Sequence, residues 1–370
     1  MTAMAIGLSS CERMTSMMPD DETPPMMDEG ITIGVALAET GEFAEPYGIP
    51  MKRGLELAQE EINALGGPSI SFVSADPEST IDGAKAAIQE LVNQGVPAIV
   101  GIGISTHLEQ AFPIAQDAGV VAFSPISSAA GLSSLGDYIF RTGLTVSVLN
   151  SNGTMVTHGK LDYKKAALIY NAADTYSKSS NAAFEETLKK IGVEILTVET
   201  FQTGDTDFST QLTSIMGMEP DVLFISALSG EMTQIITAAK SSGISAQLVV
   251  PDLTGKEIQE VGDAAEGAIT FAGWFGMANT PGNQAFVQKY KEKHGSEPGP
   301  WAAQAYATLH ILANAIMNAQ SPDAMGIRDA LAQTTDLTTI LGNFSFDPNG
   351  EAVYDPIVFM VKDGALQLFE

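Results

Sequence analysis

Short apolar runs alternate with longer amphipathic segments in the first part of the chain. Four short segments rich in apolar residues predict buried strands: residues 31–38, 69–75, 98–102 and 120–124. Three segments between them repeat apolar residues with the spacing of one helix face: residues 50–65, 81–95 and 107–118. Strands that alternate with helices through short connections predict a parallel sheet covered by helices on both faces.

The same alternation starts again further along the chain. Five more apolar runs predict strands: residues 165–170, 194–201, 221–226, 248–251 and 268–273. Three helical segments lie between them: residues 176–191, 208–216 and 230–242. We therefore expect a second sheet of the same kind, and a cleft between the two units at the carboxyl ends of their strands.

The C-terminal part has a different pattern. A link interrupted by Gly and Pro covers residues 274–284. Three helices are predicted after it: residues 283–294, 301–319 and 323–333. Short strands then close the chain, with turns expected at Asn349-Gly350 and Asp363-Gly364.

The length and charge of the chain limit the classes of protein to which it can belong. A chain of 370 residues is long enough for two domains, and no apolar stretch approaches the roughly 18–20 residues that span a membrane. There are 45 acidic against 18 basic residues, a formal net charge of −27. Such a surface repels polyanions, so we expect no nucleic-acid partner.

Cysteine and histidine give no sign of a cofactor. Cys11 is the single cysteine, so no intramolecular disulfide can form. The four histidines lie far apart in the sequence and match no zinc-binding spacing. We expect neither a metal nor another cofactor.

The N-terminal segment carries a possible anchor signal. Leu8-Ser9-Ser10-Cys11 resembles a bacterial lipobox, in which the cysteine becomes lipid-modified. Residues 12–30 are rich in Met, Pro, Asp and Glu without periodicity, as in a disordered linker. Only ten residues precede Cys11, and none is Lys or Arg, so we expect residues 1–30 to hold a truncated signal and a linker. The alternative is an unmodified cysteine in an unstructured tail.

Two strand ends place small residues and hydroxyls before a predicted helix or turn. The first is Gly101-Ile102-Gly103-Ile104-Ser105-Thr106, and the second is Ser124-Pro125-Ile126-Ser127-Ser128. The dinucleotide-binding, P-loop and nucleophile-elbow motifs each lack a required residue here.

Binding a carboxylate requires fewer specific residues in these segments than the three motifs above do. It needs only free backbone N–H groups at a helix N-terminus and nearby hydroxyls, which Ser105, Thr106, Ser127 and Ser128 supply. The alternative for each hydroxyl is ordinary N-capping. Two such sites at adjacent strand ends favour ligand binding.

Residues 31–370 resemble the branched-chain amino-acid-binding family of ABC-transporter substrate-binding proteins. The resemblance rests on the opening segment and five motifs: residues 31–67, GIGIST, SPISS, YIFRT (138–142), DFSTQL (207–212) and FDPNGE (346–351). It implies the type I periplasmic binding fold, an α/β class with two doubly wound parallel-sheet lobes joined by a three-segment hinge. Lobe 1 would comprise residues 31–147 plus 280–346, and lobe 2 residues 151–276 plus 352–370.

The resemblance also implies a ligand site. The hydroxyls of Ser105 and Ser128, with neighbouring amides, would hold the carboxylate of an amino acid. The backbone carbonyl of Ile126 would accept a hydrogen bond from its ammonium group. Tyr47 and Trp301 match aromatic walls of lobe 1.

Lobe 2 would complete this site. Tyr176 matches a tyrosine that closes over the ligand, and Asp252 matches an acid that pairs with the ammonium. Leu228 stands where binders of leucine, isoleucine and valine have a tyrosine, and Asp252 is one methylene shorter than their glutamate. These departures leave amino-acid binding in place and put the branched-chain preference in question.

Each of these residues also has a simpler interpretation. Tyr47 and Tyr176 could be aromatic residues of surface loops. Asp252 could cap the helix near Gly255, and Trp301 could anchor the core.

The sequence therefore predicts a non-enzymatic, extracytoplasmic receptor that delivers an amino acid to a membrane-embedded ABC permease. It would reside in the periplasm or on the outer face of the cytoplasmic membrane, touching the membrane only through a lipid anchor. One alternative is the same fold binding an amide, urea or small organic acid. Another is a regulatory lipoprotein that does not take part in transport.

Overall fold

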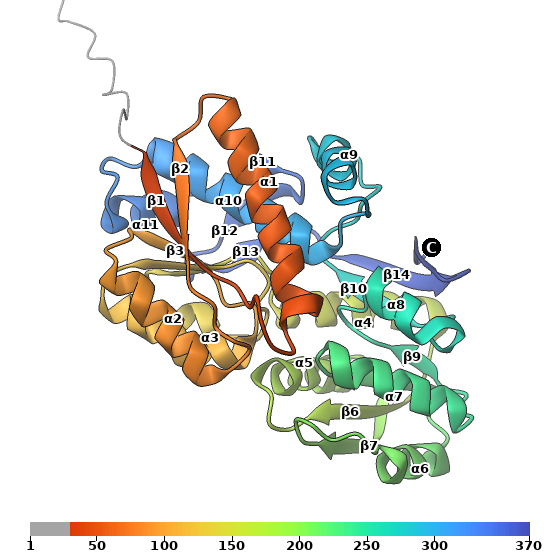
Figure 1. Ribbon diagram of the computed structural model, residues 1–370. Coiled ribbons are helices and arrows are strands. Elements are labelled where there is room, and N and C mark those ends of the chain that lie inside the picture. The colour runs from red at the N-terminus through yellow and green to blue at the C-terminus, as the bar shows by residue number, and fades with distance from the viewer. Residues whose placement is uncertain (1–29) are drawn as a thin grey trace, which may run out of the picture.

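The computed structural model describes residues 30–370, so the predictions for Cys11 and its linker lie outside it. Two α/β lobes lie side by side, each built around its own sheet (Figure 1). We call the lobe that holds β1 lobe 1 and the lobe that holds β6 lobe 2. The predicted α/β class with two wound sheets is confirmed.

Lobe 1 contains an all-parallel sheet of five strands in the order β2-β1-β3-β4-β5. The strands are β1 (Ile31–Ala36), β2 (Ile70–Ser74), β3 (Ala98–Gly101), β4 (Val121–Ser124) and β5 (Ile139–Arg141). The helices of this lobe are η1 (Ala44–Gly48), α1 (Ile49–Ala64), α2 (Ile81–Asn93), α3 (Ser105–Asp117), η2 (Leu132–Leu135), α9 (Asn283–His294), α10 (Pro300–Asn318) and α11 (Ala324–Ala332). A small antiparallel sheet adds β11 (Leu337–Thr339), β12 (Gly342–Phe346) and β13 (Ala352–Val353).

Lobe 2 contains a seven-stranded sheet in the order β15-β14-β10-β9-β8-β6-β7. The strands are β6 (Lys165–Asn171), β7 (Glu194–Phe201), β8 (Val222–Ser226), β9 (Gln247–Val249), β10 (Ile269–Ala272), β14 (Ile357–Lys362) and β15 (Ala365–Leu368). The helices are α4 (Val146–Leu161), α5 (Thr175–Ile191), α6 (Ser209–Met218), α7 (Ser229–Ser241), α8 (Gly255–Val261) and η3 (Gly262–Ala265). β14 pairs antiparallel with β10 on one side and with β15 on the other. The prediction of a purely parallel sheet is therefore wrong for this edge.

Helix α4 was not predicted from the sequence. Its buried face includes Asn150, Gly153 and Thr154 beside Val146 and Leu149, so the apolar spacing of a helix is broken. Gly153 is required there because a Cβ atom would lie 2.3 Å from the ring of Phe271. Close packing of small and polar residues replaces the apolar stripe.

The close contact between α1 and α10 brings two aromatic residues to the edge of the cleft. Gly54 of α1 lies against the backbone of α10, where a Cβ atom would be 2.1 Å from the carbonyl oxygen of Ala302. This approach places Tyr47, just before α1, near Trp301 at the start of α10, with ring centroids 6.0 Å apart.

The chain crosses between the lobes after β5, after β10 and after β13. Tyr354 of the third crossover donates a hydrogen bond of 3.1 Å to the carbonyl oxygen of Thr142 in the first. Gly273 of the second crossover packs against the same ring, since a Cβ atom there would lie 2.5 Å from the Tyr354 hydroxyl. One tyrosine therefore touches all three crossovers.

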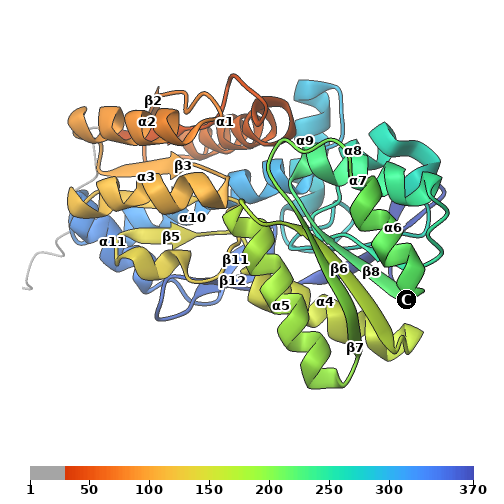
Figure 2. The ribbon, with the colours of Figure 1, turned by 90° about the horizontal axis from the view of Figure 1, so that it is seen from below.

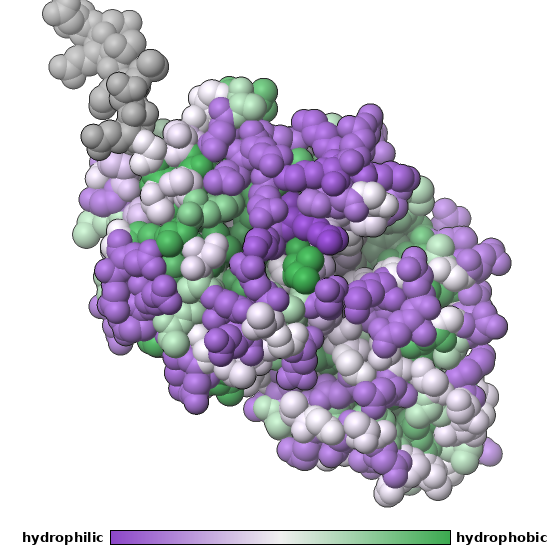
Figure 3. Space-filling view, viewed as in Figure 1, coloured by the Kyte–Doolittle hydropathy of each residue, from purple (hydrophilic) through white to green (hydrophobic). Residues whose placement is uncertain are grey.

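Figure 2 shows the lobes side by side, with α5 of lobe 2 next to lobe 1 at their boundary. The face seen in Figure 3 is mostly hydrophilic, with scattered apolar residues. Among residues 30–370, the structure has no helix with both the length and the apolarity needed to cross a membrane.

Candidate ligand-binding cleft

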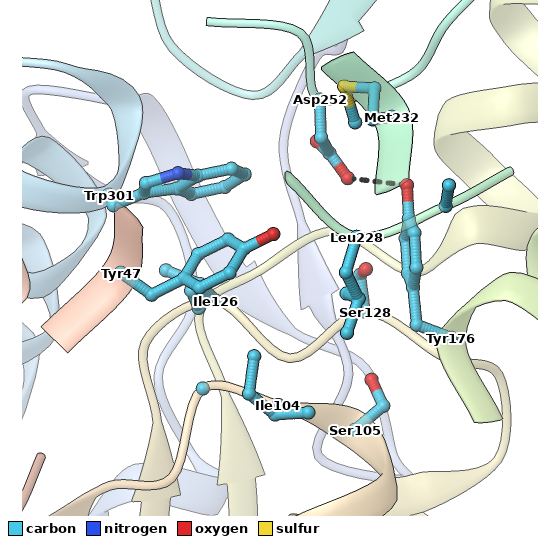
Figure 4. A pocket seen from close by; sticks show the side chains of 12 residues that line it. Tyr47, Ile104, Ser105, Ile126, Ser128, Tyr176, Leu228, Met232, Asp252 and Trp301 are labelled. Carbon is cyan, nitrogen blue, oxygen red and sulfur yellow. Dashed lines mark hydrogen bonds between the residues drawn. The ribbon is translucent and has the colours of Figure 1, made fainter. Parts of the chain in front are cut away.

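A pocket lies between the lobes at the carboxyl ends of their strands (Figure 4). Twelve residues line it: Tyr47, Gly103, Ile104, Ser105, Ile126, Ser128 and Trp301 from lobe 1, and Tyr176, Ala227, Leu228, Met232 and Asp252 from lobe 2. Its free space is about 380 Å³, including the part open to solvent. A cleft of this size suits a small solute such as an amino acid and is too small for an oligosaccharide.

Ser105 lies at the start of α3, at the lower edge of the pocket in Figure 4. The N-cap of α3 is Ile104, whose side chain cannot accept a hydrogen bond, so the alternative that Ser105 is an ordinary N-cap is wrong. The Ser105 hydroxyl is 2.9 Å from the Ser127 hydroxyl and accepts a hydrogen bond from the Ala129 amide. The α3 helix also begins two residues earlier than predicted.

Ser128 lines the pocket, whereas Ser127 lies behind it and does not. Ser127 is buried, and its hydroxyl contacts the hydroxyl of Ser105. It was predicted to bind the ligand directly, but the structure places it behind Ser105 and outside the pocket lining. Ile126 contributes its side chain to the lining.

Thr106 also differs from the prediction, because it does not line the pocket. Its hydroxyl donates to the Asp174 carboxylate at 2.7 Å and accepts from the Thr175 amide at 2.8 Å. Both partners belong to lobe 2, since Asp174 is the N-cap of α5. Thr106 therefore joins the lobes.

A second inter-lobe contact involves Tyr47. Its hydroxyl accepts a hydrogen bond of 2.9 Å from the amide of Ser229, the first residue of α7. Tyr47, Tyr176 and Trp301 are 8%, 6% and 9% exposed, so the two tyrosines are not aromatic residues of surface loops. Trp301 is both packed against Tyr47 and part of the pocket wall.

Asp252 carries the charge of the site. It lies between β9 and α8 with a φ of 60°, and its carboxylate accepts a hydrogen bond of 2.9 Å from the Tyr176 hydroxyl. The N-cap of α8 is Thr254, which forms a capping box with Glu257, so the alternative that Asp252 caps this helix is wrong. Burial raises the pKa of Asp252 to about 6, and the hydrogen bond from Tyr176 partly opposes that rise.

Leu228 and Met232 form the apolar side of lobe 2, one helical turn apart at the start of α7. Asp252 is the single carboxylate among the twelve lining residues, and none of the twelve is basic. The cleft therefore presents a helix N-terminus and hydroxyls on lobe 1, and one carboxylate with apolar side chains on lobe 2.

Sequence reasoning did not single out Arg141, which holds the Ser127–Ala129 loop from behind. Its guanidinium is fully buried and donates to the carbonyl oxygens of Ser127 and Ala129 at 3.2 and 2.5 Å. Its other side pairs with the carboxylate of Glu351. Arg141 and Glu351 both lie in motifs that carry the family resemblance. An arginine directly after the apolar residues Ile139 and Phe140 is the sequence feature that could have pointed to a buried ion pair.

Gly103, Ile104, Ala227 and Met232 also line the pocket without having been predicted. Within residues 30–370, no group of three or more His, Cys, Asp or Glu side chains is placed to hold a metal ion.

The family model for periplasmic binding proteins matches residues 30–365. The chain belongs to this family. The crystal structure of a leucine-binding protein from Thermotoga maritima superposes with a TM-score of 0.87 at 26% identity, and the match covers 92% of this chain and 98% of that one. The expected type I periplasmic binding fold is thereby confirmed.

Two further relatives belong to the branched-chain amino-acid-binding group. The transporter substrate-binding protein of Streptococcus pneumoniae, solved in complex with isoleucine, is 30% identical with a TM-score of 0.85, covering 92% of this chain and 98% of that one. A leucine-, isoleucine-, valine-, threonine- and alanine-binding protein of Pseudomonas aeruginosa is 28% identical over 86% of this chain and 87% of its own length. The predicted resemblance to this group is confirmed.

Proposed function

We propose that this periplasmic binding protein is the extracytoplasmic receptor of an ABC transporter and binds an amino acid between its lobes. The observation that carries the proposal is the placement of Asp252 on lobe 2 opposite Ser105, Ser128 and the N-terminus of α3 on lobe 1. A zwitterion has one group for each side: a carboxylate for the helix N-terminus and an ammonium for Asp252.

Hydrogen bonds between the lobes would keep the ligand in the closed cleft. Hydrogen bonds from Ser229 to Tyr47, from Thr106 to Asp174 and from Ala130 to Ser179 join the lobes across the cleft. The ligand would stabilise this closed arrangement, which the permease would then distinguish from an open one.

The proposed domain boundaries suit such a hinge. Lobe 1 would comprise residues 31–147 plus 280–346, and lobe 2 residues 151–276 plus 352–370, except that β13 (Ala352–Val353) pairs with β12 and so belongs with lobe 1. The crossovers between them would bend as the lobes open.

These contacts are sufficient to account for micromolar binding of an amino acid. A hydrogen bond to a charged group contributes roughly 1.5–3 kcal/mol, and micromolar affinity needs about −8 kcal/mol. Two or three such bonds plus burial of one aliphatic side chain against Ile104, Leu228 and Met232 therefore suffice. The names of the relatives support an aliphatic amino acid as the ligand.

Two parts of the proposal rest on sequence and family alone. A lipid on Cys11 would hold the receptor at the outer face of the membrane, and a membrane-embedded permease would take the ligand. Mass spectrometry of the protein purified from its host would detect the lipid on Cys11.

The decisive experiment is a thermal-shift screen of the full chain against amino acids, small amides, urea and organic acids. A ligand at a hundred times its dissociation constant adds about 2.7 kcal/mol of stability. We expect leucine, isoleucine or valine to raise the melting temperature of the wild type, and Asp252→Asn to lose most of that rise. Stabilisation by uncharged amides or organic acids alone would replace the amino-acid assignment, and no response to any solute would contradict a transport role.

A further inference from the structure

A small cavity adjoins the ligand pocket next to Trp301, on the hinge side. The two share Ile126, Ser128, Asp252 and Trp301, and the cavity is completed by residues of the crossovers and by Gln304. It is smaller than the ligand pocket and has room for about one water molecule or one ammonium group.

Gln304 is the buried polar side chain of this cavity. It lies on α10 one turn after Trp301 and is 5% exposed. Its Nε2 donates to the Tyr354 hydroxyl at 3.2 Å, while its Oε1 is buried without a partner among the described residues. A buried amide oxygen in that position needs a donor, because leaving it unpaired is costly.

The hinge fixes which end of the Gln304 amide faces the cavity. A tyrosine hydroxyl has a single proton, and that of Tyr354 goes to the carbonyl oxygen of Thr142. Tyr354 can therefore only accept from Gln304, which must present its NH₂ group to the hinge. The carbonyl end is left for the cavity that Asp252 also lines.

We propose that Gln304 is a second side-chain acceptor for the ligand's ammonium group, and that with Asp252 it selects a protonated amine over the same skeleton without one. The inference rests on the proposed function and extends it. An ammonium has three donors, and Asp252 with the expected backbone carbonyl of Ile126 accounts for two of them. Gln304 supplies a neutral acceptor beside the carboxylate, either directly or through one water, and Tyr354 is its positioning residue.

Calorimetric titration of the full-length protein with L-leucine and with its 2-hydroxy analogue tests this inference. In Gln304→Leu we expect the dissociation constant for leucine to rise about tenfold, and that for the hydroxy analogue to change less than about twofold. Tyr354→Phe should cause a smaller loss with the same selectivity, because the amide is then free to rotate.

Thr308→Val is the matched control. Thr308 lies one turn further along α10 and does not line the cavity. The variant removes a hydrogen bond of 2.8 Å to the Thr142 hydroxyl and one of 2.7 Å to the backbone carbonyl of Gln304, and it leaves the Gln304 side chain in place. It should bind both probes within about twofold of the wild type.

Three results would overturn the inference. Gln304→Leu could bind leucine as the wild type does, it could lose both probes equally, or Thr308→Val could show the same loss of leucine. In each case wild-type binding of leucine would leave the proposed function standing. A wild type that binds no amino acid at all would instead remove the proposed function, and this inference with it.

Discussion

The carboxyl of Asp252 makes the chemistry of the cleft dependent on pH. Burial raises its pKa to about 6, well above that of an aspartate in an unfolded chain. The folded, ligand-free protein therefore holds this proton more tightly than the unfolded chain, and ionised Asp252 lowers stability above pH 6. A bound ammonium would favour the ionised form and offset that cost.

We expect the affinity for an amino acid to fall as the pH drops below 6, by about tenfold per pH unit, because only ionised Asp252 pairs with the ammonium. The contribution of Asp252 to ligand-free stability has the opposite sign and increases as the pH falls through 6. Calorimetric titration between pH 5 and 8 measures the first effect, and thermal denaturation without ligand measures the second.

Asp252→Asn separates Asp252 from other titrating groups. We expect it to bind about 30-fold more weakly than the wild type at pH 7 and to show a flat dependence on pH. If the variant kept the wild-type slope, another group would be responsible.

Single residues also show where sequence reasoning succeeded and where it stopped. Ser105 and Ser128 were predicted from hydroxyls at strand and helix ends, whereas Tyr47, Tyr176 and Asp252 were expected only from the family resemblance; all five line the pocket. Ala227, Met232 and Gln304 have no such signal. They reach the cleft only because the two lobes and the α1–α10 packing bring them together.

At the scale of elements, the N-termini of α3 and α5 meet across the cleft. Asp174 caps α5 with one carboxylate oxygen, which accepts from the Ser177 amide at 2.7 Å, and receives the Thr106 hydroxyl on the other. The cap is thus shared by a residue of the opposite lobe. Separation of the lobes would break this contact without unfolding either helix.

Thr106→Val tests that contact. We expect the affinity for the ligand to fall about fivefold, because two hydrogen bonds of the closed arrangement are lost, while the melting temperature without ligand changes little. Calorimetric titration and thermal denaturation measure the two quantities. Thr32→Val, an exposed position on β1, is the control, and an equal loss in both variants would contradict a role in closure.

The pairing of Arg141 with Glu351 joins the end of β5 to the segment between β12 and β13. Removing one partner of a buried ion pair leaves an uncompensated charge. We expect Glu351→Gln to lower the free energy of unfolding by about 3 kcal/mol, measured by urea denaturation. Arg141→Met combined with Glu351→Gln should recover part of that loss, and a double variant as unstable as the sum of the two would show that the pair is not coupled.

The strands and most helices could be predicted because their burial follows a simple period. Continuous apolar runs marked β1, β3 and β8, and amphipathic spacing marked α1, α2 and α5. The period fails in α4, where Gly153 and Thr154 pack closely in place of larger apolar residues. The direction of β14 could not be predicted, because pairing with β10 depends on contacts far apart in the chain.

The whole molecule carries a net charge of −27. Like charges on a compact surface repel one another, and dissolved salt screens that repulsion over distances of about 10 Å at 0.1 M. We expect the melting temperature to rise when sodium chloride is increased from about 10 mM to 500 mM. Differential scanning calorimetry measures it, with sucrose as an uncharged control, and a melting temperature that falls with salt would show that attractive ion pairs dominate.

The order of strands in the lobe 2 sheet has a consequence for how the chain is made. β14 pairs with β10 and β15 pairs with β14, yet both strands lie within residues 357–368, downstream of every other strand of that sheet. Lobe 1 likewise cannot complete its packing before α10 is made, and residues 300–318 of this helix follow strands β6 to β10 of lobe 2 in the sequence. Neither lobe can be complete until residues 300–368 have been made, so we expect the growing chain to stay incompletely folded until these segments are available to both lobes.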